Sequence, residues 1–117
     1  MNVVILCGAV SRPPSTRPLP SGDQLVALEV TTPPPQGRAK QVPVVRPTGP
    51  ERLLRLEAGA EVVVTGRVRR RFFRAGGATA SRTEVVADAV WPAHHAARVA
   101  RVLDQAVERV GVPASRE

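Results

Sequence analysis

The run EVVVTGRVRRRFF at residues 61–73 is followed by the turn sequence AGGA at residues 75–78 and by the run SRTEVVADAV at residues 81–90. Both runs are rich in β-branched side chains, which favour strands, and the two glycines between them favour a tight turn. The segment therefore predicts a long β-hairpin in a mainly β chain.

Three further strands are predicted upstream of this hairpin, at residues 2–10, Gln24–Thr32 and Lys40–Arg46. The first is a continuous apolar run that predicts a buried strand, in which Cys7 is expected to be a small core residue. The second alternates apolar with other residues, which is the period of a half-buried strand. Pro43 lies inside the third and indicates an edge position or a bulge.

A short helix is predicted between the third and fourth strands. Thr48 and Glu51 have the spacing of a capping box, leucines follow them, and Gly59 supplies the stop. We expect a helix of about two to three turns. Five strands with a single helix between the third and the fourth is the arrangement of the OB fold, a small β-barrel, and this is the fold class that we predict.

The hydrophobic period changes after residue 92. Apolar residues then recur at steps of three and four, which predicts an amphipathic helix over residues 93–111. Its stripe consists of Ala96, Val99, Leu103, Ala106 and Val110, widened by Val102 and Val107. We expect this stripe to be buried, either against the barrel or in an oligomer. Residues 1–92 form the predicted OB domain, and residues 112–117 a disordered tail.

The chain is strongly basic. Its net charge is +7, and 16 of the 17 basic residues are arginine, with Lys40 the exception. Such a charge favours a polyanionic partner. A GC-rich genome also produces a composition rich in arginine, alanine, valine and proline. The positions of the arginines therefore decide between a functional and a purely compositional origin of the charge. Five of them lie between Arg67 and Arg74, which favours a functional cluster.

The hairpin combines this charge with aromatic side chains. Arg67, Arg69 and Arg71 are predicted to form one solvent-facing row on their strand, able to follow the phosphates of a nucleic acid. The alternative is a solvated strand face that only limits aggregation. Of the adjacent Phe72 and Phe73, one is expected to point inward and one outward, where its ring can stack on a base. The alternative is that both belong to the end of the barrel core.

Other residues give little sign of chemistry. Trp91 lies at the strand–helix junction, where it is expected to pack the helix on the barrel. His94 and His95 are helical neighbours that point in different directions, which makes a poor metal site. With one cysteine and no nucleophile paired with a base, we predict no enzyme activity, no cofactor and no metal. The lack of a long apolar segment or a charged leader predicts a cytoplasmic protein without membrane contact.

Three segments resemble the bacterial single-stranded DNA-binding protein (SSB) family. The opening NVVILCG at residues 2–8, followed by Arg12 and Pro13, is similar to the family's first strand. GAEVVVTGRV at residues 59–68 resembles its fourth strand, and RTEVVADAV at residues 82–90 its fifth. The resemblance covers residues 1–91 and implies an OB barrel that binds single-stranded DNA and works as a dimer or tetramer.

The sequence also departs from that family. SSB proteins stack bases on aromatic side chains, but this chain has only Phe72, Phe73 and Trp91. TPP at residues 32–34 and KQV at residues 40–42 stand where the family usually has tryptophans, and only Phe72 keeps an aromatic at a stacking position. An amphipathic helix replaces the family's acidic tail. This pattern resembles a specialised paralogue, such as the primosomal replication protein N branch.

The sequence therefore predicts a non-catalytic protein that binds single-stranded DNA without sequence preference, in replication, recombination or repair. The alternatives are a protein-assembly module that has lost its stacking aromatics and an RNA-binding OB domain. Expected partners are single-stranded DNA or RNA, further copies of the chain, and another replication or repair protein. The candidate nucleic-acid-binding residues are Arg67, Arg69, Arg71, Phe72, Phe73, Arg74 and Arg82 in the hairpin, and Arg12, Arg17, Arg38 and Lys40 in neighbouring loops.

Overall fold

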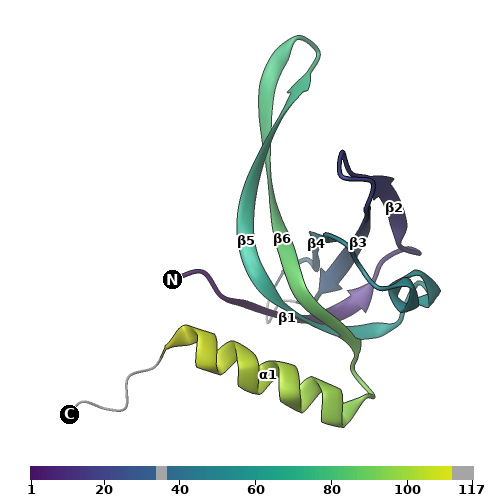
Figure 1. Cartoon of the computed structure of the whole chain (residues 1–117), viewed down its shortest axis with the longest axis vertical. Helices are drawn as coiled ribbons and strands as arrows, with labels where there is room; N and C mark the ends of the chain where they lie inside the picture. The colour runs from purple at the N-terminus through teal and green to yellow at the C-terminus, as the bar shows by residue number, and fades with distance from the viewer. Residues whose placement is uncertain (34–36, 112–117) are drawn as a thin grey trace.

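The computed structural model describes residues 1–33 and 37–111. Within them the chain is mainly β, as predicted, with one six-stranded sheet, a short 3₁₀ helix and a C-terminal α-helix (Figure 1). The strands are β1 Val4–Val10, β2 Ser15–Pro18, β3 Gln24–Thr32, β4 Lys40–Arg46, β5 Glu61–Ala75 and β6 Ala78–Pro92. The helices are η1 Glu51–Arg55 and α1 Ala96–Val110. The predicted disordered tail, residues 112–117, lies outside the described residues.

The strand order in the sheet is β1-β5-β6-β4-β3-β2, and β1 also pairs with β3. Only β4 and β6 run parallel to each other, and the other pairs are antiparallel. The pairing of β1 with β3 is limited to Ala9 opposite Thr31 and Val10 opposite Val30. β1, β5, β6, β4 and β3 thus follow one another in a closed cycle of pairings, and β2 adds to the far edge of β3.

The core lies between the faces of the strands that carry the alternating apolar residues. Its buried members are Val10, Val26, Leu28, Val30, Val44, Leu53, Val62, Val64, Val85, Ala87 and Val90. The alternation predicted for β3 is therefore confirmed, and Leu53 of η1 fills the same core. A smaller cluster of Leu25, Val45 and Val86 lies apart from this core, on the alternate positions of β3, β4 and β6. Burial of these side chains, at about 25 cal/mol per Å² of apolar surface, is the main stabilising term.

A register shift between Thr65 and Gly66 interrupts the β5–β6 hairpin. Gly66 lies opposite Ala87, and Asp88 of β6 is left without a partner in β5. Only glycine fits here, because a Cβ on Gly66 would lie 2.1 Å from the carbonyl oxygen of Val86. An irregularity of this kind increases the local twist.

Beyond this point the hairpin continues as a two-stranded ribbon, residues 69–84, which we call the arm (Figure 1). β4 pairs with β6 only at Val85 and Val86, so β4 does not flank the arm. The predicted turn is confirmed at the tip, where Gly76 and Gly77 have φ angles of 57° and 82°. Two consecutive positive φ angles are what a two-residue hairpin turn requires.

The helix predicted after Thr48 is wrong in type, length and cap. η1 is a five-residue 3₁₀ helix with Pro50 at its N-cap and no side-chain capping hydrogen bond. Thr48 has a φ of 51° and lies outside the helix. The reason is Pro50, which cannot donate a backbone hydrogen bond and disfavours a helical conformation at the residue before it.

Two predictions for the first 20 residues are also wrong. Cys7 is exposed rather than part of the core, because β1 alternates: Val4 and Leu6 pack on the core, whereas Ile5 and Cys7 do not. Arg17, predicted to lie in a loop, lies instead on β2, which pairs with β3. As the outermost strand of the sheet, β2 tolerates Pro18 at its end.

α1 packs against β5 and β6, below the sheet in Figure 1. The predicted amphipathic helix is confirmed, but its most buried residues are Val102 and Ala106, while Ala96 and Val107 are exposed. Gly111 ends the helix with a φ of 62°. None of the helices in the described part of the chain is long and apolar enough to cross a membrane.

Candidate nucleic-acid interface

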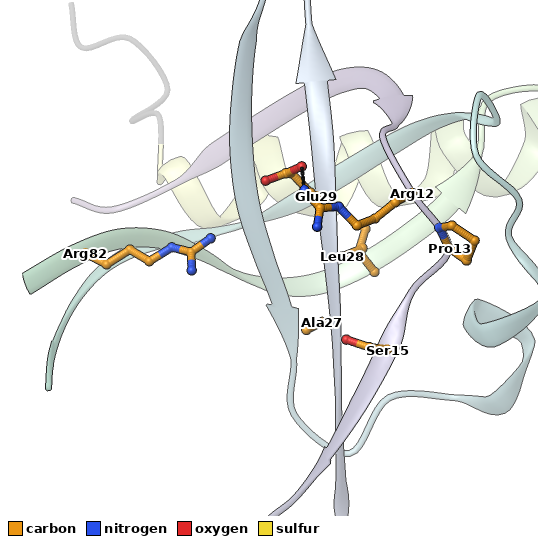
Figure 2. A pocket seen from close by; sticks show the side chains of 7 residues that line it. All are labelled: Arg12, Pro13, Ser15, Ala27, Leu28, Glu29 and Arg82. Carbon is orange, nitrogen blue, oxygen red and sulfur yellow. Dashed lines mark hydrogen bonds and ion pairs between the residues drawn. The ribbon is translucent and has the colours of Figure 1, made fainter. Parts of the chain in front are cut away.

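A pocket of about 340 Å³ lies between the β2–β3 hairpin and the arm (Figure 2). We call it the groove. It is lined by Arg12, Pro13 and Ser15 before and in β2, by Ala27, Leu28 and Glu29 of β3, and by Arg82 of β6. The groove therefore brings together two of the arginines that the sequence singled out, Arg12 and Arg82, from segments 70 residues apart.

The groove has an excess of positive charge. Arg12 forms an ion pair with Glu29, with 3.1 Å between Nη2 and Oε1. Arg82 extends toward the same carboxylate from the other wall (Figure 2), and forms no ion pair within residues 1–33 and 37–111. Two guanidinium groups thus share the neighbourhood of one carboxylate, which leaves a site suited to an anion.

The arm has two faces, because residues directly opposite each other in an antiparallel pair project to the same side. One face carries the pairs Arg69–Glu84, Arg71–Arg82 and Phe73–Ala80. The other carries Arg70–Thr83, Phe72–Ser81 and Arg74–Thr79. Because Arg82 lines the groove, we call the first the groove face and the second the back face.

The three arginines of the predicted row, Arg67, Arg69 and Arg71, differ in their partners. Arg69 lies 2.5 Å from Glu84, whose side chain is only 3% exposed, so Arg69 neutralises a buried carboxylate. Arg67 lies 3.5 Å from Asp88, which also pairs with Arg109 of α1. Arg67 and Arg69 thus form ion pairs within the fold. Arg71 is the member of the row with no carboxylate partner in the described residues.

Arg71 and Arg82 lie directly opposite each other on the groove face. Like charges in this position repel each other and destabilise an antiparallel pair. The Nε of Arg71 is buried and has no hydrogen-bond partner in the described part of the chain. A phosphate between the two guanidinium groups would relieve the repulsion and accept hydrogen bonds from both.

Both phenylalanines of the arm are accessible. Phe72 is 66% exposed on the back face, and Phe73 is 37% exposed on the groove face, where the guanidinium carbon of Arg71 lies 5.5 Å from its ring centroid. The alternative that both rings belong to the core is therefore wrong, as is the expectation that one points inward. The reason is that the arm extends beyond the rest of the sheet (Figure 1), so no other described element covers the faces where these rings lie.

None of the remaining predicted residues lines the groove. Arg17 on β2 is exposed and shares a face with Ser15, two positions before it on the strand, which lines the groove. Arg74 lies near the tip of the arm and donates a hydrogen bond to the Gly77 carbonyl oxygen at 3.3 Å. Lys40 pairs with Thr32 at the opposite end of β3 and, like Arg38, does not line the groove.

Sequence reasoning missed the acidic residues that organise the site. Glu29, Glu84 and Asp88 each pair with an arginine that the sequence predicts to be free for a ligand. One signal was available for Glu84, because it stands next to the apolar Val85 and Val86 of a predicted strand. The pairing itself depends on the strand register, which the sequence does not reveal.

Asn2 fixes the base of the arm. Its side-chain amide donates to the Val68 carbonyl oxygen and accepts from the Val68 N–H, both at 2.7 Å. These two bonds continue the β1–β5 pairing by one side chain beyond the backbone ladder, which ends at Val4 opposite Gly66. Asn2 thus anchors the ribbon where it leaves the sheet.

Comparison with models of known protein families finds no match, and no curated protein matches the sequence significantly. The resemblance to the SSB family therefore stays a prediction from the residues.

Proposed function

We propose that this protein binds single-stranded DNA without sequence preference and without catalysis, in replication, recombination or repair. The observation that carries the proposal is the pair of directly opposed arginines, Arg71 and Arg82, on the groove face of the arm. A repulsive pair on a two-stranded ribbon costs stability unless an anion binds it, and nucleic-acid phosphates are such anions.

Accessible aromatic rings next to this pair favour a single strand over a duplex. Bases of a single strand are free to stack on side chains, and such stacking is worth about 1–3 kcal/mol per base. Phe73 shares the groove face with Arg71 and Arg82, and Phe72 lies on the back face next to it. A strand in the groove can place phosphates on the guanidinium groups and a base on the Phe73 ring.

The proposal includes the OB fold. The closed cycle of β1, β5, β6, β4 and β3 has the number of strands of an OB barrel, and η1 lies between the third and fourth of them in chain order. In such folds oligonucleotides lie on the sheet face and its adjoining loops. The groove has that position here, between the β2–β3 hairpin and the arm.

We also propose that the chain forms a homo-oligomer. β1 pairs with β5 through residues 4–9 but with β3 only at Ala9 and Val10, so the first half of β1 has an edge without a partner strand in the described residues. Ile5 in this half is 49% exposed. Unpaired apolar edges favour pairing with another chain, and the solution mass measures this directly.

Fluorescence anisotropy with labelled oligonucleotides tests the proposal. Single-stranded DNA, single-stranded RNA and duplex DNA of equal length are titrated with the full chain at two salt concentrations. The proposal expects the tightest binding to single-stranded DNA, and weaker binding by an Arg71→Gln/Arg82→Gln variant. Arg101→Gln, which removes one positive charge at an exposed position of α1, is the control for charge loss outside the groove.

Three outcomes would overturn it. Equal or tighter binding to RNA would favour the RNA-binding alternative. Absence of binding to all three at low salt would favour the assembly module. Unchanged affinity of the double variant would place the site elsewhere, with Arg12 and Arg17 as the next residues to replace.

A further inference from the structure

A second group of arginines surrounds Trp91 at the end of β6, and none of its members lines the groove. Arg52 of η1 places its guanidinium carbon 3.6 Å from the centroid of the indole ring, and Arg98 of α1 places its own at 5.0 Å. η1, β6 and α1 therefore meet at one ring. The prediction that Trp91 connects the terminal helix to the sheet agrees with these contacts.

Arg46, the last residue of β4, is the third arginine of this group. Burial lowers the pKa of Arg52, and the charges of Arg46 and Arg98 lower it further. The ring contacts place Arg52 and Arg98 at Trp91, and Arg46 joins them through the effect of its charge on Arg52. Arg46 donates to the Pro47 carbonyl oxygen at 3.5 Å, a neutral acceptor that does not offset its charge. We call Arg46, Arg52, Trp91 and Arg98 the arginine–tryptophan cluster.

None of the cluster's arginines forms an ion pair in the part of the chain that the structure describes. The four ion pairs found there use Arg12, Arg67, Arg69 and Arg109 and leave the cluster's arginines unpaired. α1 adds to the imbalance, because it begins beside the cluster with no acidic residue in its first turn and no side-chain cap on its N-terminal N–H groups. The positive end of the helix dipole therefore adds to three arginines that form no ion pair in the described residues.

We propose that the arginine–tryptophan cluster is a second phosphate-binding site, which takes a phosphate group of a nucleic-acid strand. The proposal rests on the proposed function for the identity of the strand. It assigns the cluster a ligand of its own, separate from the groove.

The chemistry favours a nucleotide over an acidic peptide. Guanidinium groups donate paired hydrogen bonds to phosphate oxygens, and bases stack on guanidinium planes as well as on aromatic rings. At 3.6 Å the Arg52 guanidinium is in van der Waals contact with the indole, which limits its motion and keeps it in place for both contacts. An acidic peptide would bind the positive charge of the arginines but has no base to stack on them.

Trp91 reports on its own site. It is the single tryptophan of a chain that has no tyrosine, so the tryptophan emission comes from the cluster alone. The full chain is titrated with inorganic tripolyphosphate, with a single-stranded oligothymidylate and with a hexaglutamate peptide. Anisotropy of a labelled oligothymidylate is followed in parallel, and it reports binding anywhere on the protein.

Saturable changes of Trp91 emission are expected with tripolyphosphate and with the oligonucleotide, and weaker binding with the peptide. Arg46→Gln, which removes no ring contact, and Arg98→Gln should each raise the tripolyphosphate midpoint about tenfold, the effect typical of removing one charge-assisted hydrogen bond. Arg101→Gln lies one turn from Arg98 and should leave it unchanged. Arg71→Gln/Arg82→Gln should also leave it unchanged, because those residues belong to the groove.

Failures of the two proposals are distinguishable. Anisotropy that rises while Trp91 emission stays constant would overturn this site and leave the proposed function standing. A response to tripolyphosphate without any binding of the oligonucleotide would overturn the nucleic-acid source of the phosphate, and the proposed function with it. A peptide that binds as tightly as tripolyphosphate would assign the cluster to an acidic protein instead.

Discussion

Arg71 lies directly opposite Arg82 across the arm, and both project to the face that borders the groove. The neighbouring pair of the same face differs from it in charge. Arg69, the next residue of that face on β5, has Glu84 opposite it and is neutralised, whereas Arg71 has a second arginine in the same position. Within one short ribbon, a balanced pair is thus followed by an unbalanced one.

The unbalanced pair predicts opposite effects on stability and binding. Arg82→Gln removes the repulsion, so the free energy of unfolding should stay equal or rise by about 0.2–1 kcal/mol. Affinity for single-stranded DNA should fall in the same variant. Chemical denaturation and anisotropy measure the two quantities. Loss of both stability and affinity would mean that Arg82 supports the fold, and the argument for an anion between the two arginines would fail.

Salt dependence should identify the same arginines. Affinity is expected to fall steeply with salt, because a bound strand releases counterions from its phosphates. In Arg71→Gln/Arg82→Gln the slope of log affinity against log salt should be smaller by about 0.7 for each phosphate that the variant no longer binds. Anisotropy titrations at four salt concentrations give the slope. A parent protein that binds tightly with a nearly flat response would contradict an electrostatic site.

Arg69 should behave differently from the other arginines of the arm. Arg69→Ala leaves the carboxylate of Glu84, 3% exposed, without its partner, and should lower the free energy of unfolding by about 1–3 kcal/mol. Arg70→Ala on the back face is the control and should change stability little. Adding Glu84→Gln to Arg69→Ala should recover part of the loss, which a double-mutant cycle in denaturant quantifies. Equal stability of Arg69→Ala and Arg70→Ala would show that the ion pair does not support the fold.

Structure that depends on residues close in sequence could be predicted, and pairings between distant strands could not. Strand periodicity was sufficient for β3, for the long hairpin and for the glycine turn, because each depends on residues close in sequence. The split of Arg67, Arg69 and Arg71 was not accessible, since it depends on which acidic residues β6 places opposite them. The helix after Thr48 differs for a local reason, because Pro50 disfavours a helical conformation at the residue before it. The exposure of Cys7 depends on tertiary packing, because only Val4 and Leu6 of its strand face the core.

Replacing the phenylalanines should affect DNA binding more than protein stability. Phe73→Ala should weaken binding of single-stranded DNA by about 1–3 kcal/mol if its ring stacks on a base, with little change in salt slope. Because the ring is 37% exposed, the loss of stability should stay well below the roughly 3–5 kcal/mol of a buried phenylalanine. Phe72→Ala, on the back face, is the comparison for a ring outside the groove. Equal effects of the two variants on affinity would mean that the strand does not follow the groove face.

The last prediction concerns α1, whose apolar residues fall into a covered and an uncovered set. Val102 is buried where α1 packs on the sheet, with only 6% of its surface exposed. Val102→Ala should therefore lower the free energy of unfolding by about 1–3 kcal/mol. Val107 is 56% exposed, so Val107→Ala should leave the stability of the single chain unchanged.

A smaller solution mass of Val107→Ala, with unchanged unfolding of the dissociated chain, would place an oligomer contact on the uncovered side of α1. An unchanged mass would leave the unpaired edge of β1 as the candidate contact, and Ile5→Lys should then reduce the mass. Light scattering and urea denaturation of the three variants make both comparisons. If Val102→Ala were as stable as the parent, α1 would not be held by the contact that the structure describes.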